Sequence, residues 1–157
     1  MIKHSGHTGF VATTREGLIT YHYFKRILEG MGADVETLQR VRAVMRELSI
    51  NAVKHGSNIE APSAELIYRR PILIGKQIVY PGKLTVRIEN ALRGGSALTN
   101  ERIIQLLKQP IPPGRRPTGI QQLAKMGVHI KAGINTHYGE PIQVVKAKMP
   151  IRTRRQI

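Results

Sequence analysis

The chain lacks cysteine and tryptophan, and it has few aromatic and few acidic residues. Among its 157 residues there is no Cys and no Trp, and aromatic residues make up 4%. Without thiols there can be no disulfide and no thiolate metal site, which suits the reducing cytosol. The core must therefore consist of aliphatic side chains, and a hydrophobic content of 41% is sufficient for one.

Long hydrophobic runs are also missing. No apolar run reaches the roughly 18 to 20 residues that a membrane-spanning helix needs, and the N-terminus has no signal-peptide pattern. We therefore expect a soluble, cytoplasmic protein. Its length predicts a single domain over residues 1–157, with a core at about 10–150 and a basic tail at 151–157.

The scarcity of acidic residues leaves the chain strongly basic. Lys and Arg total 25 against 10 Asp and Glu, a formal net charge of +15. Such an excess favours anionic partners, including nucleotide phosphates, nucleic acid, an acidic protein or a membrane surface. The basic residues form short groups, and no zinc-finger spacing or basic zipper is present. Solvated surface charge is the simplest interpretation of most of them.

The hydrophobic pattern predicts the order of helices and strands. An edge strand is expected within 1–12, and Thr13 and Asp34 are expected to cap the first two helices. The first helix is predicted to follow Thr13 and to end near 28, and three others to cover about 35–54, 100–109 and 120–126. Strands are predicted at 64–74, 77–89, 128–135 and 142–149, with a turn or bulge at Pro81-Gly82 inside the second of them. Loops are expected at 90–95 and, as a flexible flap, at 110–119. This order predicts an α+β fold, a two-layer α/β sandwich with a mainly antiparallel sheet and helices on one face.

The predicted helix at 35–54 carries the most informative pattern. Glu47, Asn51 and His55 recur at spacings of four, so a carboxylate, an amide and an imidazole share one stripe of its surface. A second stripe is apolar and can face the core, with Leu38, Val41, Met45, Leu48 and Ala52. A polar, solvent-exposed edge of an ordinary helix is the alternative interpretation of the first stripe.

The segment Glu47-Leu-Ser-Ile-Asn51-Ala-Val-Lys54-His55-Gly56 resembles the N box of the Bergerat-fold (GHKL) ATPases, which include gyrase, Hsp90, histidine kinases and MutL. Over about 10–150, the order of elements is similar to that of the stand-alone members, the anti-sigma-factor serine kinases and their partner-switching relatives. The resemblance implies that Asn51 holds a Mg²⁺ that bridges the ATP phosphates. It also implies that Glu47 acts as the catalytic base, and it places Lys54 and His55 near the phosphates or ribose.

Two later segments extend the resemblance. In Ile88-Glu89-Asn90-Ala-Leu-Arg-Gly94-Gly95, Asn90 stands where most members carry an Asp, which implies that it reads adenine through its side-chain oxygen. Gly94 would contact the nucleotide, although a simple turn is an equal alternative. Gly114-Arg115-Arg-Pro-Thr118-Gly119 is similar to the glycine-rich lid that leads into a helix. There Arg115, Thr118 and Gly119 would hold phosphate through charge and backbone N–H groups.

Three functional interpretations follow from these observations. The first is an ATP- and Mg²⁺-binding regulator, either a protein serine/threonine kinase or an ATPase. Its partner would be acidic, such as a sigma factor or an anti-sigma antagonist, and homodimerisation is left open. The second is a catalytically inactive protein-binding module of the same fold. The third is a basic nucleic-acid-associated protein, although few aromatic side chains are available to stack on single strands.

Overall fold

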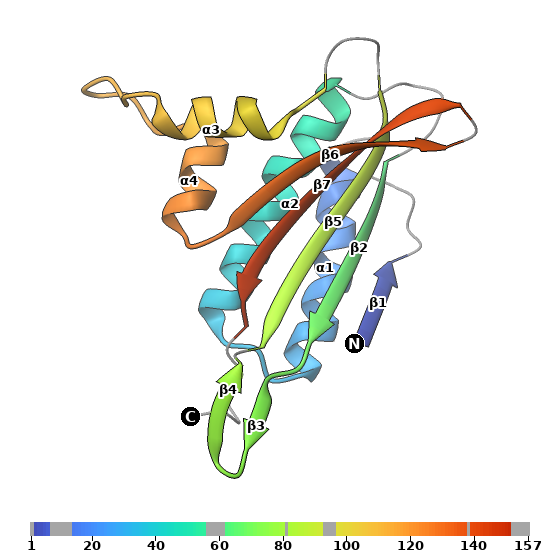
Figure 1. Ribbon diagram of the computed structural model, residues 1–157, viewed down its shortest axis with the longest axis vertical. Helices are drawn as coiled ribbons and strands as arrows, with labels where there is room; N and C mark the ends of the chain where they lie inside the picture. Colours follow the sequence, from blue (N-terminus) through green and yellow to red (C-terminus); the bar gives the residue numbers. More distant parts are fainter. Residues whose placement is uncertain are drawn as a thin grey trace.

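The computed structural model describes residues 2–6, 14–55, 62–80, 82–92, 97–137 and 139–151. Its elements are β1 (Ile2–Gly6), α1 (Thr14–Gly30), α2 (Val35–His55), β2 (Ser63–Arg69), β3 (Ile72–Ile74), β4 (Gln77–Tyr80), β5 (Lys83–Ala91), α3 (Asn100–Lys108), α4 (Gly119–Lys125), β6 (His129–His137) and β7 (Glu140–Pro150). Five strands form one antiparallel sheet in the order β1-β2-β5-β7-β6, and β3 and β4 form a separate hairpin. The predicted α+β sandwich is confirmed (Figure 1).

Helices α1 and α2 cover one face of the sheet, and α3 and α4 lie beside its β6 edge (Figure 1). The break between α1 and α2 follows from local chemistry. Gly32 adopts a φ of 78°, which a residue with a side chain rarely does, and this ends α1. Asp34 then caps α2, since its Oδ1 accepts a hydrogen bond from the N–H of Thr37 at 2.8 Å. The predicted cap at Asp34 is confirmed, whereas Thr13 lies outside the described residues.

The core lies between α2 and the central strands. Strand β5 alternates strictly, and its inward side chains are buried at Leu84, Val86, Ile88 and Asn90. They pair in register with Met149, Ala147, Val145 and Gln143 of β7. The apolar stripe of α2 packs against them as predicted, and each fully buried aliphatic side chain of this kind contributes about 1.5–3 kcal/mol.

Two predicted strands were wrong in their extent. The expected strand at 64–74 is divided into β2 and β3. The expected strand at 77–89 is divided into β4 and β5, on either side of the turn or bulge predicted at Pro81-Gly82. Pro71 follows β2, and proline has no N–H for a ladder hydrogen bond, so the chain leaves the main sheet there. Gly75, at a φ of 62°, then turns β3 back onto β4. The hairpin projects from one end of the sandwich (Figure 1).

Candidate functional site

Asn51 and Asn90, which the resemblance assigns to Mg²⁺ and to adenine, line one small cavity. This cavity of about 10 Å³ lies between α2, β5 and β7. It is lined by Leu48, Asn51, Ala52, Ile88, Asn90, Gln143 and Val145. Asn90 was predicted to lie in a loop, which is wrong: β5 extends to Ala91 because Asn90 pairs with Gln143 of β7. Its side chain is therefore buried in the layer between sheet and helix.

The amide groups of this cavity are partly held by backbone atoms. Asn90 donates from Nδ2 to the carbonyl of Ala91 at 3.4 Å. Gln143 donates from Nε2 to the carbonyl of Leu98 at 2.6 Å, which fixes the segment before α3 at the edge of the cavity. Gln143 was not among the predicted site residues. Strand alternation, which also turns Val145, Ala147 and Met149 inward, could have identified it as a buried polar side chain.

Glu47 and Gly119 also meet, one turn of α2 before Asn51. Gly119 is the first residue of α4, and the half-buried Glu47 carboxyl group lies directly over its Cα. A Cβ at Gly119 would overlap all three carboxyl atoms, so this contact requires glycine. Burial raises the pKa of Glu47 above its ordinary value of 4.5, and the neighbouring Arg46 opposes this only in part. Because Gly119 has no side chain, the Glu47 carboxyl group can occupy the space beside its Cα.

The start of α4 is held by a reciprocal capping box. The side chain of Thr118 accepts from the N–H of Gln121 at 3.3 Å, and Gln121 Oε1 accepts from the N–H of Thr118 at 2.9 Å. Gln121 also donates from Nε2 to the carbonyls of Leu106 and Gln109 at 2.8 and 2.9 Å. This buried glutamine was missed, although the Thr-x-x-Gln spacing is a capping signature that could have found it.

A third missed residue, Arg40, anchors the other end of α4. Its Nε donates to the carbonyl of Met126 at 2.7 Å, directly after the helix ends. Glu36, one turn earlier on α2, lies 3.8 Å from the guanidinium as an exposed ion-pair partner. Helix α4 is therefore fixed to α2 at both ends, by Arg40 at its C-terminus and by the Glu47 contact at its N-terminus.

The remaining predicted residues are less well placed. Arg115 is exposed between α3 and α4, where its N–H donates to the Pro112 carbonyl at 3.1 Å. Lys54 and His55 belong to the last turn of α2, but their side chains are outside the description, as is all of Gly94. Their roles stay predictions. Over the described residues no group of three or more His, Cys, Asp or Glu could hold a metal ion.

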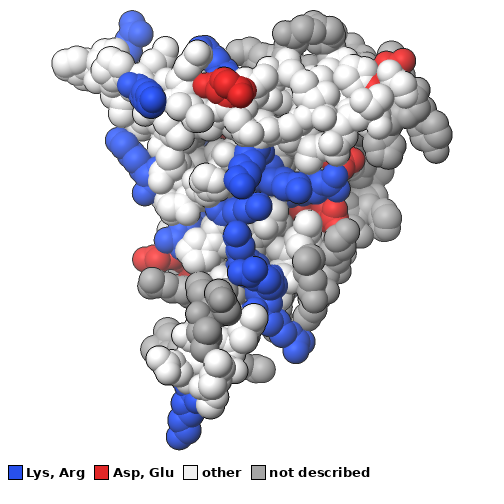
Figure 2. Space-filling model, in the orientation of Figure 1, with Lys and Arg blue, Asp and Glu red and all other residues white. Residues whose placement is uncertain are grey.

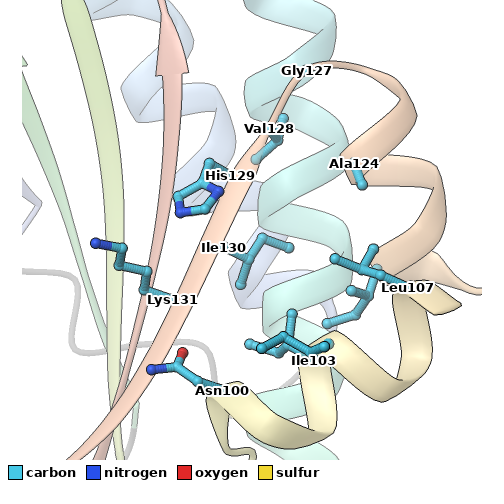
Figure 3. Close-up of a pocket in the computed structure, with 11 residues that line it drawn as sticks. Asn100, Ile103, Leu107, Ala124, Gly127, Val128, His129, Ile130 and Lys131 are labelled. Carbon is cyan, nitrogen blue, oxygen red and sulfur yellow. The ribbon is translucent and has the colours of Figure 1, made fainter.

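A separate and much larger cavity has a volume of about 590 Å³ (Figure 3). It is bounded by α3, α4 and β6 and is mostly apolar, with Ile103, Leu107 and Val128 on its walls and Asn100 and Lys131 at one side. None of the predicted site residues lines this cavity. Asn100 has a structural role there, since its Oδ1 accepts from the N–H of Ala132 at 2.9 Å.

Within the described part of the chain, no helix has the length and apolar character needed to cross a membrane. Comparisons with protein-family models, with curated proteins and with solved structures find no match to this chain.

Proposed function

We propose that the protein is an ATP-binding regulator that holds Mg-ATP where α2, β5 and α4 meet. One observation carries this proposal: segments that resemble three separate nucleotide-binding motifs meet at the same end of α2. Asn51 and Asn90 line one cavity, and Glu47 contacts Gly119. The two members of each pair are far apart in the sequence. Their proximity is therefore an observation separate from the sequence motifs that suggested the site.

The donor set suits the two parts of this ligand. Side-chain amides offer both an acceptor and donors, which are the groups that read the edge of a purine. The Asn51 oxygen is a hard ligand of the kind that Mg²⁺ takes, and this ion normally completes its shell with phosphate oxygens and water. Mg²⁺ bound by Asn51, phosphate oxygens and water would not need a cluster of protein carboxylates.

ATP binding requires the site to open. The cavity between Asn51 and Asn90, at about 10 Å³, has room for roughly one water molecule and not for a purine. The Gln143–Leu98 hydrogen bond and the Glu47–Gly119 contact would have to separate. Because Gln121 ties α4 to the end of α3, we expect these two helices to move as a unit.

Phosphoryl transfer is the activity that this site would support in its full form. ATP supplies the transferable phosphoryl group, and Glu47 would accept the proton of a serine or threonine hydroxyl of the acidic partner protein. The raised pKa of Glu47 brings this carboxylate nearer to the proton affinity that a general base needs at neutral pH.

A specific observation favours the second candidate, a binding module without turnover. The N–H of Thr118, which the motif assigns to phosphate, already donates to Gln121. Pro117 has no N–H to offer, so the lid has few free donors for phosphate. Nucleotide binding and catalysis must therefore be tested separately.

Calorimetric titration of ATP, with and without Mg²⁺, tests binding. We expect saturable binding to the wild type and an affinity at least about tenfold lower, or 1.4 kcal/mol, in Asn51→Ala and in Asn90→Ala. Asn135→Ala, on the exposed part of β6, is the matched control and should bind as the wild type does. Absence of binding to the wild type would refute the proposal.

Turnover is tested with ATP labelled at the γ-phosphate. If the protein is a kinase or ATPase, Glu47→Gln should retain binding and lose label release or transfer. Glu140→Gln, an exposed carboxylate at the start of β7, should keep both. Binding without turnover in the wild type would assign the protein to the non-catalytic candidate.

A further inference from the structure

Basic side chains gather on the face of the five-stranded sheet that α1 and α2 leave uncovered. Figure 2 shows Lys and Arg concentrated over the middle of this face. Because inward and outward residues alternate, the register identifies outward basic residues on four adjacent strands. We name these five residues the lysine face: Arg69 of β2, Lys83 of β5, Lys131 of β6, and Lys146 and Lys148 of β7.

The strand register sets these like charges against one another. Lys146 stands directly opposite Lys131, and Lys83 stands opposite Arg69. Like charges at directly opposed positions destabilise a sheet. The pKa of Lys148 is lowered, mainly by partial burial and to a smaller extent by repulsion from Lys83, Lys131 and Lys146. The lysine face therefore carries a local folding cost that a bound anion would offset.

The nearby carboxylates do not neutralise the lysine face. Arg87, in the middle of the sheet, forms ion pairs with two of them: Glu65 lies 3.6 Å from its guanidinium group, and Glu89 forms a closer ion pair. None of the ion pairs found among the described residues includes a member of the lysine face. Among the described residues the lysine face has no paired counter-charge, so an external anion would supply one.

The composition of the surface decides which anion it fits. Four of its five charges are lysines, which act as flexible point charges, whereas planar carboxylates are recognised best by the rigid fork of arginine. The outward positions described on β2, β5, β6 and β7 include no Phe, Tyr or Trp. A protein interface therefore has no Phe, Tyr or Trp anchor here, and the imidazole of His129, opposite Lys148, is the one ring that these described positions offer to unpaired bases.

We propose that the lysine face binds the phosphate backbone of double-stranded nucleic acid without reading its sequence. A duplex presents a dense and nearly continuous row of phosphates, and lysines spread over four strands can each find one. Binding of this kind needs no cavity and no base contacts. It uses the opposite face of the sheet from the proposed ATP site, and it does not rest on ATP binding.

The test is fluorescence anisotropy with a labelled duplex DNA of arbitrary sequence, in the absence of nucleotide and over a range of salt. With four to five phosphate contacts at about 0.9 each, the slope of log affinity against log salt should be about −4. Affinity should then fall about 10²–10³-fold between roughly 50 and 200 mM salt. Binding that is weak and insensitive to salt would overturn the proposal.

A pair of triple variants separates a specific surface from net charge. Lys131→Gln/Lys146→Gln/Lys148→Gln should reduce the steepness of the slope by about 2.7 and weaken binding at least tenfold. The same charge is removed by Lys76→Gln/Lys108→Gln/Lys125→Gln, on the β3–β4 hairpin, α3 and α4, and this control should bind as the wild type does. Equal losses in the two triples would mean that only net charge matters, and would refute the assignment.

Competing ligands distinguish the partner class. Poly-glutamate and vesicles that contain phosphatidylserine should bind more weakly than the duplex at equal salt, and a single strand of the same length should bind less tightly. Preferential binding of poly-glutamate or of the vesicles, lost in the lysine-face triple, would overturn the duplex in favour of an acidic protein or a membrane. Thermal melts keep the test valid, because removal of like charges should leave the triple as stable as the wild type or more so.

Discussion

The contact between Glu47 and Gly119 can be tested by adding a single methyl group. In Gly119→Ala the new Cβ would occupy the space of the Glu47 carboxyl group, so either that side chain or the start of α4 must move. The backbone at Gly119 is not in the left-handed region, so alanine itself introduces no backbone strain. Any loss of stability should therefore arise from its neighbour on α2.

The expected magnitude follows from two opposing terms. Overpacking of a rigid core costs about 1–3 kcal/mol, and the cost here should lie near the lower end of that range, because the overlapping atoms are the end of the flexible, half-buried Glu47 side chain. Replacement of glycine by alanine at a compatible position stabilises by about 0.4–1 kcal/mol through the unfolded chain. In the wild-type background we expect these terms nearly to cancel, with a net loss below about 1 kcal/mol. In a Glu47→Ala background the overlap is absent, and the same substitution should be neutral or stabilising.

Urea unfolding of the four proteins in this cycle gives the coupling energy, which should be about 0.5–1 kcal/mol. Gly30→Ala is a matched control, because Gly30 ends α1 with open space around it and is also outside the left-handed region. It should show no dependence on Glu47. If Gly119→Ala has the same effect with and without the Glu47 side chain, the carboxyl group does not lie over Gly119 and the closed arrangement of α2 and α4 is wrong.

Two further predictions concern the same region. Burial raises the pKa of Glu47, so its contribution to stability is fully present below the ordinary value of 4.5 and is lost as pH rises through the folded-state pKa. The free energy of unfolding of the wild type should therefore fall, relative to that of Glu47→Gln, as the pH is raised from about 4 to about 7. The measurement is urea unfolding of both proteins at the two pH values, and a difference between them that does not change with pH would contradict the raised pKa. Gln121→Ala removes the capping box and leaves two carbonyls without their donor, which should cost about 2–3 kcal/mol in the same assay. The neighbouring exposed Gln122→Ala should change stability by less than about 0.5 kcal/mol, and equal costs would show that the tethers contribute nothing.

The features that sequence predicted well are those determined by short-range periodicity. Helix α2 could be placed because its apolar stripe persists over several turns and Asp34 supplies a local cap. Strand β5 could be placed because burial alternates along its length. The division of β2 from β3 was missed because Ile72, Leu73 and Ile74 are as apolar as a core strand, yet all three are exposed. Only the ladder lost at Pro71 separates them from the main sheet.

The contacts of the candidate site depend on long-range geometry and could not be derived from any one segment. The motif resemblance assigned Asn51, Asn90, Glu47 and Gly119 to one site. In the structure Asn51 and Asn90 line the same cavity, and Glu47 contacts Gly119. The resemblance assigned Gly119 to phosphate, however, whereas its open Cα admits a carboxyl group. That difference arises from how closely α4 packs on α2, where Arg40 of α2 bonds the Met126 carbonyl at the end of α4.

The two proposed binding surfaces share strands but not side chains, and this makes them separable. On β7, Gln143 points into the layer beneath the helices, and Lys146 and Lys148 point to the open face. The side chains of the two surfaces lie on opposite faces of the sheet, and the hydrogen-bonded backbone of the strands separates them. Effects at sites without shared partners usually add. Asn51→Ala should therefore weaken ATP binding and leave the salt dependence of duplex binding unchanged, and the lysine-face triple should do the reverse. If ATP and duplex compete instead, one surface must serve both, and the separate assignments to the two faces of the sheet would be wrong.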